Sequence, residues 1–166
     1  MRLSVIIPVY NEDKYISKVV SKVNRVKLKN VTKEVIIVDD FSNDNTRKIL
    51  SGLKGKRIKK FFHNKNNGKG AAIRTGLRHS TGDIILIQDA DMEYDPKEYA
   101  KLLKPIIENK SGVVYGSRIE AIRKNLKNMY KLHFFGNLLL TVVTNILYGS
   151  KITDMETGYK VFRKEV

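Results

Sequence analysis

Short apolar runs alternate along this chain with stretches of helical periodicity, and this alternation restricts the fold more than any other feature of the sequence. The runs fall at residues 3–10, 34–40, 57–63, 83–91 and 112–118. Residues 13–27, 68–78 and 96–108 between them have the periodicity of amphipathic helices. Val/Ile-rich strands that alternate with helices predict a three-layer α/β/α fold with a mostly parallel central sheet.

The chain has no feature that divides it into separate units. No linker, internal repeat or low-complexity tract interrupts residues 1–166, which predicts a single domain. The apolar run at the start is broken by Pro8 and is too short for a secretory signal, so we interpret it as the first strand. The absence of cysteine excludes a disulfide framework and a thiolate nucleophile and is typical of an intracellular protein.

Polar residues follow four of the predicted strands. They occupy residues 10–12, 39–44, 64–70 and 89–91. Ligands of parallel α/β sheets bind beyond the carboxyl ends of the strands, so these four loops are predicted to converge on one site.

Asp89 and Asp91 form a D-x-D pattern directly after an apolar strand, in a chain whose formal net charge is +15. Carboxylates held close together repel one another unless a cation lies between them. Mg²⁺ and Mn²⁺ prefer oxygen ligands and share them with substrate phosphates. The pattern therefore predicts a divalent metal that also binds a diphosphate.

Two other loops carry groups that suit a nucleotide. Asp39 and Asp40, at a strand end, could accept hydrogen bonds from ribose hydroxyls or a base N–H. Nearby Ser42, Asn43 or Asp44 is expected to cap the helix that runs to Leu50. Gly68 and Lys69 open a helix, where free N–H groups and a cation favour phosphate, although the spacing is not that of a P-loop.

Residues 118–149 combine a basic stretch with an apolar helix. His133, Asn137, Thr141 and Asn145 fall on one narrow stripe of that helix, and large apolar residues cover the rest. The segment is typical of a membrane interface or acceptor region. A helix buried against another domain or a dimer partner fits the periodicity equally well, whereas a membrane span is disfavoured by the polar interruptions.

A sequence pI of about 9.9 attracts anions in general and does not by itself select a partner. Nucleic acid is not expected, because no known binding motif occurs and the acidic residues between 83 and 98 would repel phosphate in the absence of a metal. The three histidines have no second ligand at metal-binding spacing, so no chemistry is assigned to them. The sequence does not determine the oligomeric state.

Five motifs in order resemble glycosyltransferase family 2. They are P8-V9-Y10-N11-E12, V38-D39-D40-F41-S42-N43-D44-N45-T46, N67-G68-K69-G70, Q88-D89-A90-D91-M92-E93 and D154-M155-E156-T157-G158-Y159-K160. The closest likeness is to the branch of polyprenyl-phosphate (dolichyl-phosphate) mannosyl- and glucosyltransferases. The resemblance implies a GT-A (Rossmann-like) fold, a GDP- or UDP-hexose donor and a divalent metal, Mg²⁺ or Mn²⁺.

The resemblance also assigns site residues by matching motif positions. Asp89, Asp91 and Glu93 correspond to metal ligands, Glu93 replacing a common Gln, and Arg118 corresponds to an Arg aimed at phosphate. With Asp91 and Arg118, Asp154 completes the catalytic set, as a base for a hydroxyl acceptor. The expected donor-binding residues are Pro8, Tyr10, Asn11, Glu12, Val38, Asp39, Asp40, Gly68, Lys69, Asp89, Ala90 and Asp91.

The acceptor decides whether a general base is required. A lipid monophosphate with a second pKa of about 6 is already an anionic nucleophile near neutral pH, whereas a sugar hydroxyl needs a base such as Asp154 or Glu156. The basic and apolar segment favours the lipid phosphate, direct displacement with inversion, and a peripheral location at the cytoplasmic membrane face. The alternatives are transfer to a saccharide hydroxyl, a basic nucleic-acid-binding module and an inactive nucleotide-binding scaffold, the last because family members usually continue beyond the position of Val166.

Overall fold

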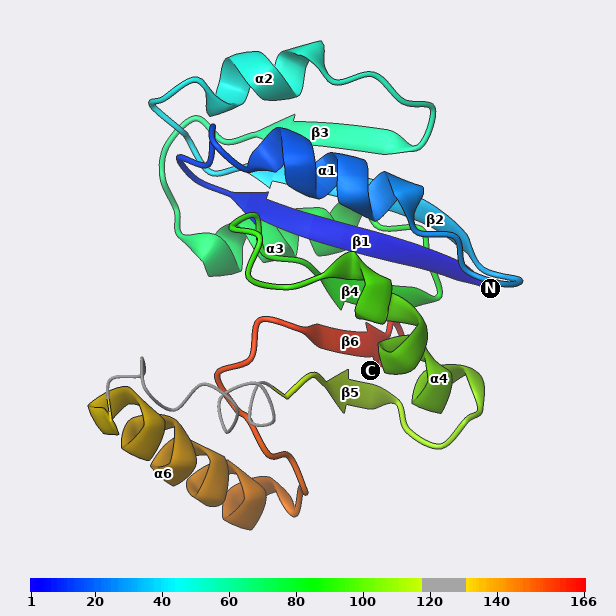
Figure 1. Ribbon diagram of the computed structural model, residues 1–166, viewed down its shortest axis with the longest axis vertical. Coiled ribbons are helices and arrows are strands. Elements are labelled where there is room, and N and C mark those ends of the chain that lie inside the picture. Colours follow the sequence, from blue (N-terminus) through cyan, green and yellow to red (C-terminus); the bar gives the residue numbers. More distant parts are fainter. Residues whose placement is uncertain (118–130) are drawn as a thin grey trace.

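The computed structural model describes residues 1–117 and 131–166, with side chains from residue 135 onward in the second range. Six strands form one sheet in the order β3-β2-β1-β4-β6-β5 (Figure 1). β1 pairs in parallel with β2 and β4, and β2 with β3, whereas β6 is antiparallel to both β4 and β5. The strands are β1 (Arg2–Val9), β2 (Thr32–Asp39), β3 (Ile58–Phe62), β4 (Ile84–Ile87), β5 (Val113–Tyr115) and β6 (Lys160–Arg163).

Helices cover both faces of the sheet and produce two apolar cores. The helices are α1 (Ile16–Arg25), α2 (Thr46–Gly52), α3 (Lys69–His79), the 3-10 helix η1 (Pro96–Glu98), α4 (Tyr99–Ile107) and α6 (Lys131–Tyr148). Side chains from α1, α2 and α4 share the larger core with one face of the strands. Ala72, Ile73 and Leu77 of α3 pack on the opposite face, so the predicted three-layer α/β fold is confirmed.

Strand register brings the predicted functional loops to one edge. Val9 is level with Asp39 on the neighbouring strand, and Ile6 is level with Ile87. The N–H of Asp40 donates to the carbonyl of Val9, 2.8 Å away. The loops after β1, β2 and β4 therefore begin side by side at the carboxyl edge of the sheet.

Two details go beyond the predictions. β6 was not expected, because its four residues include Lys160 and Arg163 and contribute only one fully buried apolar side chain, Val161. The helix predicted to run to Leu50 is α2, which ends at Gly52. None of the three predicted residues is its N-cap, which is Asn45 without a side-chain capping bond, but Asp44 accepts from the N–H of Thr46, the first helical residue, at 2.9 Å.

The long helix α6 turns Asn137, Thr141 and Asn145 of its polar stripe toward the protein, whereas the His133 side chain lies outside the described part. Asn137 and Thr141 are buried, while apolar side chains such as Leu139 (64% exposed) and Ile146 (76% exposed) face outward. The Asn137 amide donates to Asp154 at 2.8 Å, and the Asn145 amide donates to the carbonyl of Ile152 at 2.9 Å. In the part of the chain that the structure describes, no helix is long and apolar enough to cross a membrane.

Candidate nucleotide and metal site

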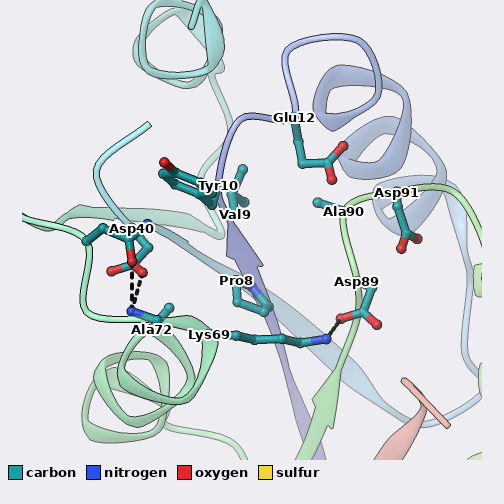
Figure 2. Close-up of a pocket in the computed structure, with 12 residues that line it drawn as sticks. Pro8, Val9, Tyr10, Glu12, Asp40, Lys69, Ala72, Asp89, Ala90 and Asp91 are labelled. Atoms are coloured by element: carbon teal, nitrogen blue, oxygen red, sulfur yellow. Dashed lines mark hydrogen bonds and ion pairs between the residues drawn. The ribbon is translucent and has the colours of Figure 1, made fainter. Parts of the chain in front are cut away.

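A pocket of about 270 Å³ lies at the carboxyl edge of β1, β2 and β4, against the start of α3 (Figure 2). Parallel sheets of this kind bind ligands at the point where neighbouring connections leave on opposite faces, which is the position of this pocket. Its walls come from all four predicted loops. The lining residues are Pro8, Val9, Tyr10, Glu12, Asp40, Asn66, Gly68, Lys69, Ala72, Asp89, Ala90 and Asp91.

The carboxylates of Glu12, Asp89 and Asp91 give one side of this pocket a negative potential. Burial raises the pKa of Glu12, and the nearby charges of Asp91, Asp44 and Asp89 raise it further. Among the described residues the Glu12 carboxylate has no hydrogen-bond or ion-pair partner. Only its backbone is bonded, since the N–H donates to Thr46 and the carbonyl accepts from Tyr15 and Ile16. When neighbouring negative charges raise the pKa of a partly buried carboxylate, a cation bound there is favourable.

Within the described part of the chain, Lys69 is the one cation that lines the pocket opposite these acids. Lys69 Nζ lies 2.5 Å from Asp89 Oδ1, and Figure 2 shows the lysine reaching across the pocket to this carboxylate. Lys69 is the first residue of α3, where the helix dipole and unpaired N–H groups also favour anions. Gly68 precedes it with φ +84°, a conformation that side chains other than glycine rarely adopt.

Asp40 holds the loop that carries Gly68 and Lys69. Its Oδ2 accepts from the Gly68 N–H at 2.7 Å, and its Oδ1 accepts from the Asn67 N–H at 3.0 Å and contacts His63 Nδ1 at 2.7 Å. Burial disfavours the charged form of Asp40, but the hydrogen bonds from His63, Asn67 and Gly68 outweigh it, so its pKa is lowered. Asp40 thus lines the pocket while most of its hydrogen-bonding capacity is used within the protein.

Strained backbone marks three of the loops at this edge. Asn11, Phe41 and Met92 have φ values of 53°, 67° and 69°, and they follow β1, β2 and β4 respectively. Such conformations cost free energy in residues other than glycine, and strain of this kind clusters at functional sites. Met92 directly follows Asp91, whose Oδ1 accepts from the Glu93 N–H at 2.9 Å, so the D-x-D turn is held by its own backbone.

Tyr159 and Gly158 of the C-terminal motif help to set the orientation of the Asp89 side chain. Gln88 accepts from the hydroxyls of Tyr99 at 2.7 Å and Tyr159 at 3.1 Å, and its amide donates to the Asp89 carbonyl at 3.0 Å. Gly158 lies against the Asp89 carboxylate so closely that a Cβ there would overlap Oδ2. Gly158 belongs to the fifth sequence motif, but the sequence alone predicts no role for it.

Several predicted donor-binding residues do not line the pocket. Val38 is fully buried in the core against α3. Asn11 lies on the surface, where its side-chain oxygen accepts from the Asn43 N–H at 2.9 Å and ties two loops together. Asp39 is fully buried, and its Oδ2 pairs with Arg47 Nε at 3.1 Å, which positions α2.

Only some of the predicted catalytic and metal-binding residues lie at the pocket. Asp91 is exposed at the pocket, next to Asp89. Asp154 is fully buried and accepts from Asn137 of α6, and Glu93 is exposed outside the lining. Arg118 lies outside the described residues. Sequence reasoning missed Val9, Asn66 and Ala72 in the lining, and it assigned no chemistry to His63, although His63 stands at a strand end like the other site residues.

The comparison with protein families agrees with this geometry. A family model described as glycosyl transferase family 2 matches residues 4–166. The chain belongs to this family. The resemblance based on the five motifs is therefore confirmed.

Family 2 relatives of known name cover nearly all of this chain. A UDP-N-acetylglucosamine--dolichyl-phosphate N-acetylglucosaminyltransferase from Methanococcus voltae is 36% identical over 176 residues, with 96% of this chain and 68% of that protein covered. The dolichyl-phosphate beta-glucosyltransferase ALG5C of Trichomonas vaginalis is 34% identical over 96% of this chain and 51% of its own length. The chain thus spans roughly half to two thirds of these two relatives.

A solved structure supports the fold assignment. The mannosyltransferase PcManGT from Pyrobaculum calidifontis, in complex with GDP-Man and Mn²⁺, superimposes with a TM-score of 0.69, at 23% identity, over 98% of this chain and 44% of that one. At this identity the likeness concerns the fold alone. The expected GT-A fold is confirmed.

Proposed function

We propose that this chain carries the donor site of a metal-dependent glycosyltransferase that moves a sugar from a UDP-sugar to a polyprenyl phosphate at a membrane surface. The observation that carries the proposal is the pocket itself, in which Glu12, Asp89 and Asp91 face Lys69 and the start of α3. Adjacent negative and positive surfaces suit a diphosphate that is bound together with a cation.

The acidic residues fit a metal that is shared with substrate. No cluster of three or more His, Cys, Asp or Glu among the described residues could hold a metal by itself. Nucleotide-dependent sites commonly bind Mg²⁺ through one or two carboxylates and complete its coordination with phosphate oxygens and water. Asp91 and Asp89 would hold such an ion, which would stabilise the charge that develops on the diphosphate leaving group. A role for Glu93 as a third ligand stays a prediction.

The remaining pocket residues suit the nucleoside and its phosphates. Lys69 and the N–H groups at the start of α3 would bind phosphate oxygens. Tyr10, 47% exposed, offers a ring at the pocket wall. Asp39 Oδ1 has no hydrogen-bond partner in the described part of the chain, but Asp39 is fully buried outside the pocket lining, so its role as acceptor for a base N–H stays a prediction. We favour UDP because the Methanococcus voltae relative is named for a UDP-sugar.

A lipid phosphate is the acceptor that these features favour. Both named relatives act on dolichyl phosphate by name. An acceptor phosphate oxygen would attack the anomeric carbon as the bond to the diphosphate breaks, and the electron pair would leave with the nucleoside diphosphate. No general base is then needed, which agrees with the burial of Asp154 against Asn137. Which sugar is transferred, and at which membrane face, stays a prediction.

Isothermal titration calorimetry tests the donor. We expect UDP, UDP-GlcNAc or UDP-Glc to bind at least about tenfold more tightly with Mn²⁺ than without it, because the diphosphate and the ion would share ligands. GDP and GDP-Man serve as matched nucleotides. Tighter binding of GDP would overturn the choice of UDP, and the absence of binding by any nucleotide would overturn the proposed function.

The outward face of α6 is our candidate for membrane contact. The helix follows a basic stretch in the sequence, and its exposed apolar side chains offer what an interfacial helix inserts. We expect Ile146→Glu and Leu139→Glu each to weaken binding to vesicles of phosphatidylglycerol and phosphatidylcholine by about tenfold or more, because each side chain loses its burial in lipid. Vesicle flotation measures this binding.

Ile107→Glu is the control for the α6 variants, because Ile107 is an exposed apolar residue at the end of another helix, α4. It should leave vesicle binding unchanged. Equal losses in all three variants would point to a general effect of added negative charge and would contradict the assignment of α6 as the membrane face.

A further inference from the structure

His63 connects three elements around the donor pocket without lining it. It follows β3, its N–H donates to the Asp39 carbonyl at 2.8 Å, and its own carbonyl accepts from Arg47 Nη2 at 3.2 Å. These hydrogen bonds fix the backbone position from which the imidazole side chain extends. The side chain is 14% exposed, so its partners lie within the protein.

Both ring nitrogens of His63 are used. Nδ1 lies 2.7 Å from Asp40 Oδ1, and Nε2 lies 2.9 Å from the hydroxyl oxygen of Thr75 on α3. Because a carboxylate only accepts, Nδ1 must carry the proton that is donated to Asp40, and in neutral imidazole Nε2 then accepts from Thr75. One side chain thus links the end of β2 to the body of α3.

Asp40 connects His63 to the wall of the pocket. Its oxygens accept from the N–H groups of Asn67 and Gly68, which immediately precede Lys69. Lys69 in turn reaches Asp89 at 2.5 Å. Hydrogen bonds and ion pairs, together with the peptide bond between Gly68 and Lys69, therefore connect His63 to the acidic side of the pocket.

We propose that His63 is a positioning residue of the donor site, which orients Asp40 so that the loop 66–69 presents its N–H groups and Lys69 to the donor diphosphate. The inference rests on the proposed function, since it assigns a ligand to that loop. Without the Nδ1 donor, the Asp40 carboxylate loses its side-chain partner and is free to turn, and the loop loses the acceptor that fixes its two N–H groups.

Two amide variants separate the ring nitrogens. The side-chain amide nitrogen of His63→Asn falls near the position of Nδ1 and keeps a donor for Asp40, whereas that of His63→Gln falls near Nε2 and keeps only the contact with Thr75. We expect His63→Gln to weaken binding of UDP with Mn²⁺ by about 10- to 100-fold, the range of one charge-assisted hydrogen bond. His63→Asn should stay within about threefold of wild type.

Calorimetry gives the affinities, and hydrogen–deuterium exchange of peptides that cover residues 64–72 reports on the loop. We expect faster exchange there in His63→Gln and nearly wild-type exchange in His63→Asn. Thr75→Val is the control, because it removes the partner of Nε2 and leaves the contact between Nδ1 and Asp40. It should behave like His63→Asn.

The outcomes distinguish this inference from the proposed function. Wild-type affinity and loop exchange in His63→Gln, with UDP binding intact in the parent chain, would overturn the role of His63 alone. A lower melting temperature in all variants with unchanged affinity would reduce His63 to a structural residue. A parent chain that binds no nucleotide would overturn the proposed function, and the donor role of His63 with it.

Discussion

Asp91→Asn is expected to abolish metal-dependent nucleotide binding and to lower the transfer rate by about 10²- to 10³-fold, the usual cost of one strong electrostatic contact to a developing charge. Asparagine keeps the size of the side chain and an oxygen that can accept from the Glu93 N–H. Only the negative charge is lost. The effect is large because Asp91 is the exposed carboxylate of the D-x-D pattern, whereas Asp89 is already paired with Lys69.

Asp95→Asn is a matched control for Asp91→Asn. Asp95 is an exposed aspartate in the same segment, and it caps η1 by accepting from the Lys97 N–H at 3.1 Å, which asparagine can also do. We expect this control to bind UDP with Mn²⁺ as the parent chain does, as measured by calorimetry. Equal binding by Asp91→Asn and the parent chain would contradict the assignment of Asp91 to the metal.

Gly158→Ala is expected to lower activity by about 10²-fold, which is the cost of displacing a catalytic group by about 1 Å. A methyl group at this position would overlap the carboxylate of Asp89 and would lie 2.6 Å from Cε2 of Tyr94. Tyr94 is held by its hydroxyl, which accepts from the Gly158 N–H at 2.6 Å, and by its ring contact with Tyr159. The methyl group would therefore displace the Asp89 carboxylate, and the Tyr94 ring would have to shift as well.

The same substitution should also reduce stability moderately. Extra volume in a packed site costs about 1–3 kcal/mol, which corresponds to a fall in melting temperature of roughly 2–12 °C for a chain of this size. Gly52→Ala provides the control, because a Cβ there meets nothing within 4 Å. Thermal denaturation and a transfer assay below both transitions separate the two effects. Full activity in Gly158→Ala would show that the direction of Asp89 does not depend on this contact.

The sequence predicted the layout of the fold because its signals are local. Strand and helix patterns in residues 3–118 are read within windows of a few residues, and the five strands predicted from them are all present. β6 was missed because only Val161 of its four residues is fully buried, so that its pattern is no stronger than that of a loop. Its place between β4 and β5 depends on a pairing across more than 70 residues of chain.

The site was predicted in outline for a topological reason. Residues that follow parallel strands must meet at one edge, so the prediction that Glu12, Asp40, Lys69 and Asp89 converge needed only the order of the elements. The same reasoning could not separate Asp39 from Asp40. Adjacent residues on a strand point to opposite faces, and which of them reaches the pocket depends on the layer that each one meets.

The sequence by itself therefore determined the class of fold, the edge of the sheet at which the acidic and basic loops meet, and the narrow polar stripe of α6. Tertiary structure alone decided that Asn137 and Thr141 of this stripe face inward, that His63 supports Asp40, and that Gly158 leaves room for Asp89. The physical reason is the range of the interactions. Patterning and strand order act over neighbouring residues, whereas the contacts that aim a side chain join residues such as Tyr94 and Gly158, 64 positions apart, and arise only when the layers pack.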